Sequence, residues 1–433
     1  MKYLRTRHRF CNSSRVSSRQ IIVVGGGAAG FFAAIAAAEQ GASVRILEKT
    51  PRFLEKVRIS GGGRCNVTHA CFETPELAAN YPRGRRALLG PLKTFAAADT
   101  VAWFAARGVT LKTEKDGRMF PVTDSSETIV NCLSEAAKRA GVELHANCPV
   151  ETIRRGEGGK FEVTLARSTV QPASLNSVPE ELTADRVLLA TGGCRAAVAG
   201  QLAGALGHQL EPPVPSLFTF QIESPWLRSL AGVSLLQAEV AIPEAKLRER
   251  GPLLLTHWGL SGPAILKMSA WSARALHNLN YQFKLLVNWL PDLSPEQITE
   301  EFQARRQFAG AKILVNVPVA PLTARLWEQL VFAAGLDRET RWAAVTRPQM
   351  HALSQRLTRS EFMVTGKSLN KDEFVTCGGV KLGEVNFQTM ESRVCPGLYF
   401  AGELLDIDGI TGGFNFQAAW TTGYIAGLAM AAK

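Results

Sequence analysis

The chain has 433 residues, of which 46% are hydrophobic and 20% are charged, and its formal net charge is +11. This length exceeds what a single hydrophobic core usually supports, so we expect two or three domains. No apolar run approaches the roughly 18 residues that a membrane-spanning helix needs, which argues against a membrane protein.

The first 19 residues form a basic extension that holds no acidic residue and lacks the apolar core of a signal peptide. Without its six cations the net charge falls from +11 to +5, which permits an RNA partner without requiring one. Its composition predicts disorder, and two interpretations stay open: a basic arm for nucleic acid, or an extension without a role. The cations are Lys2, Arg5, Arg7, Arg9, Arg15 and Arg19.

The eight cysteines show neither a Cys-x-x-Cys pair nor a zinc-binding spacing. This pattern predicts free thiols in the reducing cytoplasm and no metal site. They are Cys11, Cys65, Cys71, Cys132, Cys148, Cys194, Cys377 and Cys395.

A glycine motif stands between a strand and a helix near the start of the chain. Gln20–Val24 predicts a buried strand, Phe31–Gln40 a helix and Ala42–Leu47 a second strand. Gly25-x-Gly27-x-x-Gly30 joins the first strand to the helix, and Glu48 ends the second strand. Such glycines bring backbone N–H groups and a helix N-terminus to a pyrophosphate, and the acid accepts bonds from a ribose. The motif therefore predicts a dinucleotide-binding βαβ unit.

A second glycine-dense segment, Ser60–Asn66, follows shortly afterwards. Its three consecutive glycines, with Gly62 at their centre, expose a nest of N–H donors, and Arg64 adds a fork of donors. Cys65 stands at the same bend and is either a proton donor or a small packing residue. Such a loop is suited to lie against a flat ring and to leave one of its faces open.

The rest of the first 196 residues predicts a mixture of helices and strands. Arg186–Leu189 is a buried strand that runs into another tight glycine turn at Gly192. The other expected elements are helices at Ala87–Gly108 and Ser125–Ala140, a hairpin at Glu114–Pro121, strands at Val142–Ala146 and Phe161–Leu165, and a polar loop at Gln171–Leu182.

After about residue 196, proline and tryptophan become common. We interpret this change as a domain boundary and divide the chain into four parts. They are a basic extension at 1–19, a first part of the cofactor-binding domain at 20–196, an inserted substrate domain at 197–366 and a second part of the cofactor-binding domain at 367–433. The insertion holds 16 Lys and Arg against 13 Asp and Glu, so its charge does not decide for RNA.

The third glycine signature, Gly412-Gly413-Phe414-Asn415, lies close to the end of the chain. A last strand at Gly397–Gly402 precedes it, followed by three acids, and a helix at Phe414–Ala429 comes after it. One of these carboxylates, Asp406 above the others, is expected to bind ribityl hydroxyls, and the helix N-terminus is expected to face a flavin pyrimidine ring. Asn415 is either a ligand or the helix N-cap. The other two acids are Glu403 and Asp408.

The three signatures make sense together as one flavin site, around which the two ends of the chain fold. They predict an FAD enzyme with an α/β fold. No second complete Gly-x-Gly-x-x-Gly is present, so NAD(P)H is expected to visit the flavin transiently.

Three further features are candidates for chemistry. His257 follows an apolar run and is either a general acid or a structural histidine. Cys377, beside two glycines, raises the same question as Cys65. The basic cluster Arg83–Arg86 either meets a phosphate or is solvated surface.

These motifs together resemble the HI0933-like (BaiN/RdsA, YhiN) flavoproteins from about Gln20 to Lys433. The marks include Thr256–Pro263, Thr389–Ser392 and Gly397–Gln417. The resemblance implies a Rossmann-like FAD-binding domain with a parallel sheet, a β-barrel-like insertion and a small helical insertion. The basic extension departs from the family pattern, which begins near the first strand. The FAD contacts expected from the family pattern and the motifs are Gly25, Gly27, Ala28, Ala29, Gly30, Glu48, Lys49, Gly62, Arg64, Cys65, Asn66, Val150, Thr191, Gly192, Gly402, Glu403, Asp406, Gly413 and Asn415.

The family implies two activities: reduction of an activated double bond in a small molecule, and reduction of a ribosomal RNA uridine to dihydrouridine. Both need a hydride from the flavin N5 and a proton from an acid, and an RNA base would have to leave its stack. The leading hypothesis is reduction of a uridine in 23S rRNA or its assembly intermediate. The alternatives are a small-molecule ene-reductase or amine oxidase, and a non-catalytic FAD-stabilised assembly factor.

Overall fold

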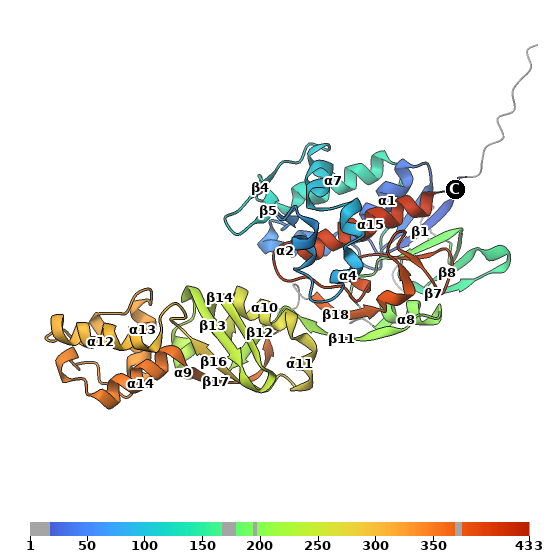
Figure 1. Cartoon of the computed structure of the whole chain (residues 1–433). Helices are drawn as coiled ribbons and strands as arrows, with labels where there is room; N and C mark the ends of the chain where they lie inside the picture. Colours follow the sequence, from blue (N-terminus) through green and yellow to red (C-terminus); the bar gives the residue numbers. More distant parts are fainter. Residues whose placement is uncertain (1–17, 167–178, 194–196, 369–374, 433) are drawn as a thin grey trace, which may run out of the picture.

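The computed structural model describes residues 18–166, 179–193, 197–368 and 375–432. Figure 1 shows an elongated molecule whose two chain ends share one lobe, while residues 219–368 form the other. We name them the sheet lobe and the barrel lobe. The basic extension up to residue 17 and most of the polar loop expected at Gln171–Leu182 lie outside the described residues.

A mostly parallel sheet forms the centre of the sheet lobe, as the sequence predicts. Within the described residues its strand order is β19-β20-β21-β10-β1-β2-β6. Strand β1 pairs in parallel with β2 and β10, and β10 pairs in parallel with β21, so a strand from the end of the chain completes a sheet begun at its start. The strands are β1 (Gln20–Val24), β2 (Ser43–Leu47), β6 (Glu143–His145), β10 (Arg186–Leu189), β19 (Val385–Asn386), β20 (Glu391–Ser392) and β21 (Leu398–Phe400).

Two small antiparallel sheets flank this centre. The hairpin expected at Glu114–Pro121 is present, because β4 pairs with β5. The first sheet contains β3 (Thr68–His69), β4 (Leu111–Thr113) and β5 (Arg118–Pro121), and the second contains β7 (Val150–Arg155), β8 (Phe161–Leu165) and β9 (Glu181–Ala184).

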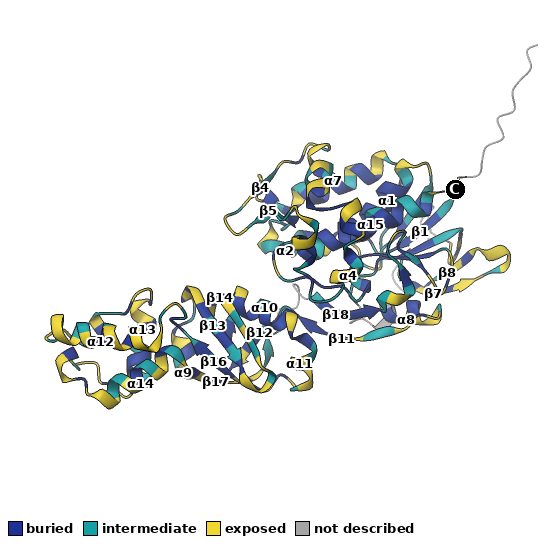
Figure 2. Ribbon diagram, in the orientation of Figure 1, coloured by how far each residue is buried: buried dark blue, intermediate teal, exposed yellow. Residues whose placement is uncertain are grey.

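The first and last long helices pack directly on each other in the sheet lobe. A Cβ added at Gly427 of α15 would lie 2.3 Å from the carbonyl oxygen of Ala33 in α1, so only glycine permits this approach. The contact joins the two ends of the chain in one core (Figure 2). The long helices are α1 (Ala28–Glu39), α7 (Ser126–Arg139) and α15 (Phe414–Ala431).

The continuous helix expected at Ala87–Gly108 is wrong. Pro91 cannot donate to a preceding carbonyl, and Phe95 has an extended backbone, so the segment forms three short helices. The shorter helices of the lobe are α2 (Glu55–Gly63), α3 (Thr74–Ala78), α4 (Arg85–Leu88), α5 (Pro91–Thr94), α6 (Ala97–Ala105) and α8 (Ala197–Ala205).

The barrel lobe is a closed antiparallel barrel, with α12, α13 and α14 at the end away from the sheet lobe and α10 and α11 on the side that faces it (Figure 1). The strand order around the barrel is β12-β15-β14-β13-β16-β17. Its strands are β12 (Thr219–Ile222), β13 (Ser234–Ile242), β14 (Leu247–Thr256), β15 (Gly259–Ser261), β16 (Phe283–Asn288) and β17 (Ser360–Ser368). Its helices are α9 (Pro225–Ser229), α10 (Pro263–Trp271), α11 (Ala273–Asn278), α12 (Pro295–Phe308), α13 (Ala324–Ala333) and α14 (Arg347–Thr358).

The barrel begins later than the boundary expected at residue 197. Helix α8 contacts β7 and β18, and the proline-containing strand β11 (Leu210–Ser216) pairs with β18 (Val375–Val380). These two strands form the connection between the lobes, so the change to proline-rich composition marks the connection and not the barrel itself. The lobes have separate cores, the second of which lies inside the barrel and under α12–α14.

Candidate active site

A cavity of about 750 Å³ lies at the carboxyl ends of β1, β2, β10 and β21. This edge of a parallel sheet is where such folds bind ligands. All three glycine signatures contribute to its wall, as do Glu48 and the turn after β10. The contributions of the signatures are residues 25–29, residues 60–62 with Asn66, and residues 412, 413 and 415.

The first glycine loop combines close packing with free donors. A Cβ on Gly30 would lie 2.0 Å from the carbonyl oxygen of Gly25, so Gly30 seats α1 on the strand and does not itself line the cavity. Gly27 is the N-cap of α1 and provides no side-chain cap, which leaves the N–H groups of the first turn for a ligand. The positive end of the helix therefore faces the cavity.

Glu48 shapes this loop as well as lining the cavity. Its Oε2 accepts a hydrogen bond from Gly26 N (2.8 Å), and its Oε1 accepts from Thr50 N (2.9 Å) and Thr50 Oγ1 (2.8 Å). A carboxylate has about four acceptor positions, so one remains for a ribose hydroxyl.

The second signature reaches the third through Asn66. In the orientation that satisfies both ends of its amide, Asn66 accepts from Gly413 N (2.9 Å) and donates to the Thr68 carbonyl (3.0 Å). Arg64 instead points at Glu114, with 2.7 Å between Nη1 and Oε1, and stacks on the Phe120 ring. The structure therefore places the predicted donor fork of Arg64 away from the described cavity wall.

Cys65 is fully buried, and its thiol is absent from the described lining of the cavity. Burial raises the pKa of this thiol to about 12, against a smaller lowering by the Ser60 hydroxyl, so the thiol is protonated at neutral pH. The burial of Cys65 favours its interpretation as a packing residue. A role as proton donor stays a prediction.

We expect Cys65 to resist alkylation in the native protein, because the thiolate is the reactive form and burial suppresses it. Cys71 is the matched control, since it is only partly buried. The measurement is mass-spectrometric mapping of iodoacetamide adducts at about pH 8. Cys71 should react first, and Cys65 should react only on unfolding. Equal rates at the two thiols would contradict this assignment.

The other predicted acid–base residues also lie apart from the cavity. His257 is exposed in the turn between β14 and β15, against the Trp258 ring. Cys377 is buried in β18 beside Val214 and Ala273, and burial raises the pKa of its thiol to about 11. Neither belongs to the described cavity lining, and neither does Val150, which is buried at the start of β7.

Among the three acids after β21, Glu403 is the one that the described cavity wall includes. Its Oε1 accepts from Thr376 N (2.8 Å) and its Oε2 from Lys56 Nζ (2.6 Å). Asp406 lies behind the wall, where burial raises the pKa of its carboxyl, and Arg274 Nη2 is 3.8 Å from its Oδ1. The geometry favours Glu403 over Asp406 for the ribityl contact.

Asn415 holds the loop before α15 and is not its N-cap, so that alternative is wrong. Its Oδ1 accepts from Gly409 N (2.8 Å), and its Nδ2 donates to the Gly409 carbonyl (2.9 Å). Gly413 occupies the N-cap position. Gly413, Asn415 and Gly402 all line the cavity.

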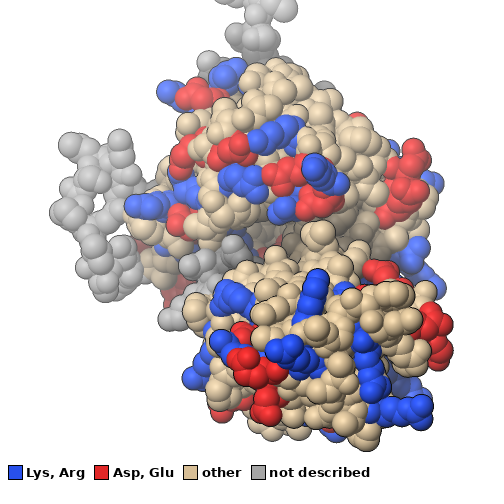
Figure 3. All heavy atoms as spheres, turned by 90° about the vertical axis from the view of Figure 1, so that its left-hand side faces the viewer, with Lys and Arg blue, Asp and Glu red and all other residues tan. Residues whose placement is uncertain are grey.

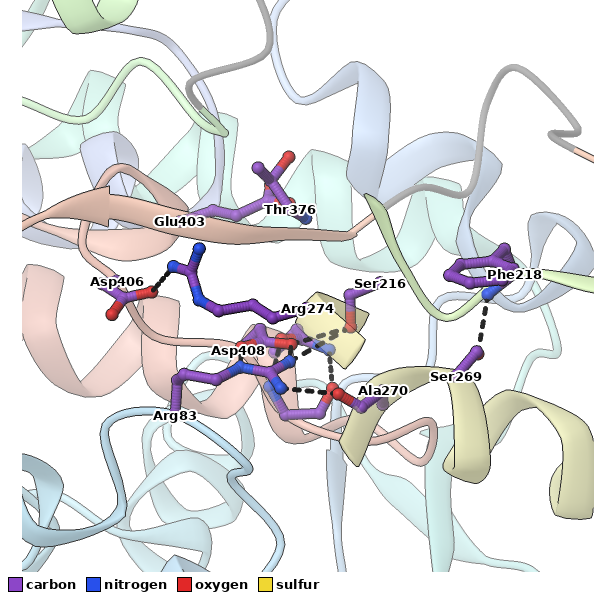
Figure 4. Close-up of polar contacts among 12 residues, drawn as sticks. Arg83, Ser216, Phe218, Ser269, Ala270, Arg274, Thr376, Glu403, Asp406 and Asp408 are labelled. Atoms are coloured by element: carbon purple, nitrogen blue, oxygen red, sulfur yellow. Dashed lines mark hydrogen bonds and ion pairs between the residues drawn. The ribbon is translucent and has the colours of Figure 1, made fainter. Parts of the chain in front are cut away.

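Arg83 forms a buried ion pair with Asp408 inside the sheet lobe and also contacts the barrel lobe (Figure 4). Its guanidinium donates two hydrogen bonds to the carboxylate of Asp408, which is 0% exposed, and a third to the Ala270 carbonyl of α10 (2.6 Å). Ser216 Oγ donates to the same carboxylate (2.7 Å). The phosphate-binding interpretation is therefore wrong for Arg83. The pair was missed because its members are 325 residues apart.

The cavity contains one polar group that points to a ligand. Thr191 Oγ1 is buried and has no hydrogen-bond partner in the described part of the chain, although Thr191 lines the cavity. Together with the free N–H groups of α1, it fits a polar ligand such as the dinucleotide FAD. Several lining residues belong to none of the expected motifs, and no signal in the sequence marks them: Thr50, Arg52, Lys56, Leu217 and Val375.

The described residues show neither a metal-binding cluster nor a membrane-spanning helix. No group of three or more His, Cys, Asp or Glu among them is arranged to hold a metal ion. None of the helices described has the length and apolar character needed to cross a bilayer.

The fold and the cavity define a dinucleotide-binding protein of the Rossmann type. The family model for the HI0933-like protein Rossmann domain matches residues 19–429, so the chain belongs to the HI0933-like family. This membership confirms the resemblance to the family that the sequence motifs indicated. The chain is therefore an enzyme, an FAD-dependent oxidoreductase.

Two relatives show the range of substrates named among similar proteins. The 3-dehydro-bile acid delta(4,6)-reductase of Clostridium scindens is 29% identical over 414 residues, 92% of this chain and 95% of that protein. The ribosomal RNA dihydrouridine synthase of Escherichia coli is 29% identical over 400 residues, 90% of this chain and 92% of that protein.

A solved structure shares the fold. The 3-ketosteroid delta1-dehydrogenase from Sterolibacterium denitrificans has a TM-score of 0.51 at 14% identity and covers 96% of this chain and 100% of that one. At this identity the likeness concerns the fold alone, and it confirms the predicted α/β architecture.

Proposed function

We propose that this enzyme reduces a uridine of 23S rRNA to dihydrouridine, with NAD(P)H as the transient reductant and the cytoplasm as its location. The two named relatives act on a bile acid and on ribosomal RNA, and uracil C5=C6 is conjugated to a carbonyl like an enone. The observation that carries the choice of RNA is the similarity to the ribosomal RNA dihydrouridine synthase. The net charge of +11, of which +6 belongs to residues 1–19, permits such a polyanionic partner.

In this proposal the sheet lobe holds the cofactor with the residues of the cavity wall. The N-terminus of α1 faces the pyrophosphate, and Glu48 accepts from the adenosine ribose. Glu403 accepts hydrogen bonds from the ribityl hydroxyls. The Thr191 hydroxyl, which has no partner among the described residues, forms a hydrogen bond with the cofactor. FAD, when bound and reduced by NAD(P)H, would supply hydride to the conjugated double bond.

The remaining residues of the site orient the flavin ring of the cofactor. The N-terminus of α15, held to Ser60–Asn66 by the Asn66–Gly413 bond, places positive dipole charge at this part of the cavity. Cys65, His257 and Cys377 stay predictions as proton donors, and each would need a different position from the one it has here to reach the cavity.

The test is the dihydrouridine content of 23S rRNA, measured by mass spectrometry in cells with and without the gene. We expect deletion to remove one dihydrouridine and the wild-type gene to restore it. A variant without flavin, such as Glu48→Ala, should not restore it. Unchanged content on deletion would overturn the proposal.

A second candidate, a small-molecule ene-reductase, is favoured by the similarity to the bile acid reductase. It predicts NAD(P)H oxidation by the purified holoenzyme when a cyclic enone is added, without any RNA. RNA-dependent oxidation alone would exclude it.

A further inference from the structure

A second cavity, of about 440 Å³, lies where the sheet lobe meets the barrel lobe. The sheet lobe contributes Ala79 and Asn80, which follow α3, together with Ile410. The barrel lobe contributes the start of β14 and the last residues of α10. Ile410 lines this cavity and the cofactor cavity alike, so the two are neighbours along one wall. Its backbone N–H donates to the Asn80 carbonyl (3.0 Å), which fixes this shared wall to the sheet lobe.

Trp271 gives this cavity an aromatic face. It is 44% exposed at the end of α10, although burial of its large ring would be favourable. Its neighbour Ala270 accepts the hydrogen bond from Arg83, so the buried ion pair fixes the end of α10 relative to the cofactor cavity. An exposed indole on a helix whose end is held in this way is a suitable platform for a flat ring.

The rest of the wall is polar. Half of the ten lining residues are polar or charged, whereas a pocket for an apolar molecule such as a steroid is lined mostly by hydrophobic side chains. Lys267 Nζ and Glu249 Oε1 form a pair 2.8 Å apart, which offers both a donor and an acceptor to the edge of a base. Arg248 Nη1 lies 3.3 Å from Glu239 Oε1, and 72% of the Arg248 side chain is exposed. Because an exposed ion pair contributes little free energy, the guanidinium can exchange Glu239 for a phosphate.

The face of the molecule at the helical end carries no patch of one sign of charge (Figure 3). Figure 3 shows the molecule from the helical end, with Lys and Arg interspersed with Asp and Glu on both lobes. An RNA strand on this face would therefore be positioned by stacking and a few local contacts rather than by a patch of one sign.

We propose that the second cavity holds a nucleobase of single-stranded RNA that flanks the target uridine. This base stacks on Trp271, and the target uridine enters the cofactor cavity beside Ile410. The inference rests on the proposed function and adds to it the part of the substrate that the enzyme recognises.

The test compares wild-type holoenzyme with Trp271→Ala, Trp271→Phe and Trp258→Ala. Trp258 is the matched control, since it is 47% exposed and lies at a turn outside both described cavity linings. The probes are a fluorescein-labelled, uridine-containing oligoribonucleotide and a 23S rRNA transcript. Fluorescence anisotropy gives the Kd at several salt concentrations, and stopped-flow absorbance gives the rate at which RNA reoxidises the reduced flavin.

Trp271→Ala should weaken RNA binding about 5- to 150-fold, while Trp271→Phe and Trp258→Ala stay within about threefold of wild type. The slope of log Kd against log salt should not change, because no charge is removed. Unchanged flavin content and Tm separate this effect from misfolding.

The outcomes distinguish this inference from the function on which it rests. Wild-type affinity of Trp271→Ala in an enzyme that reduces uridine would overturn the inference alone. Loss of binding in Trp271→Ala, when the wild type binds RNA but leaves uridine unreduced, would support the base site and overturn the proposed reaction. Absence of RNA binding by the wild-type holoenzyme would overturn both.

Discussion

Glu48→Ala is expected to yield a folded protein that purifies almost without FAD. The substitution removes the acceptor for the ribose, the hydrogen bond from Gly26 N that shapes the glycine loop, and two hydrogen bonds from Thr50. A hydrogen bond to a charged group contributes roughly 1.5–3 kcal/mol. Loss of the bond from the ribose and of the bond from Gly26 N would therefore weaken FAD binding about 10²- to 10⁴-fold. The measurement is the flavin-to-protein ratio from absorbance, with the dissociation constant from titration of the apoprotein.

Glu143→Ala is the matched control for this experiment. Glu143 lies on the neighbouring strand β6, pairs with Arg45 at 2.6 Å, and is outside the described cavity lining. It should retain full flavin. Full occupancy in Glu48→Ala would remove Glu48 from the cofactor site, whereas loss in both variants would indicate a general effect on the sheet.

Local patterns predicted the framework of the site well. The strand Gln20–Val24 forms with the expected bounds, and Glu48 follows β2, because a β-branched run next to glycines leaves few alternatives. The third signature reaches the cavity as expected, because β21 enters the sheet beside β10 and brings Gly413 with it. These features follow from local chemistry and from the rules for parallel sheets.

Directions of side chains and contacts between lobes could not be read from the sequence. Arg64 was expected to face the flavin, but Glu114, which is 50 residues away, attracts its guanidinium. Likewise Glu403, not Asp406, reaches the cavity wall, since a turn of a few residues decides which of two nearby acids faces inward. The second cavity combines three separate segments around Trp271, and no motif marks it.

Arg83→Met is expected to destabilise the protein by about 3–5 kcal/mol and to loosen the connection between the lobes. The carboxylate of Asp408 is fully buried, so removal of Arg83 leaves an uncompensated charge. Among the described residues, Ser216 is then the remaining side chain that donates to it. The substitution also removes the hydrogen bond that Arg83 donates to the Ala270 carbonyl at the end of α10. Calorimetry with limited proteolysis at the β11–β18 connection measures both effects, because two lobes need not unfold in one step.

The double variant Arg83→Met/Asp408→Asn is the control that separates charge from packing. Because a buried pair contributes little net stability, removal of both charges should recover at least half of the loss. If the double variant is no more stable than Arg83→Met, the contribution of Arg83 lies in its contact with Ala270 rather than in the ion pair.

The stability of Arg83→Met should also depend on pH with a definite sign. Burial already raises the pKa of Asp408 in the native protein, although Arg83 opposes this shift, so removal of Arg83 raises the pKa further. The folded state then binds the proton more tightly than the unfolded chain, and stability increases as the pH falls. The deficit relative to wild type should therefore shrink between neutral pH and the ordinary aspartate pKa of about 3.9, as measured by Tm at each pH. A deficit that is constant or grows over this range would show that Asp408 does not carry the buried charge.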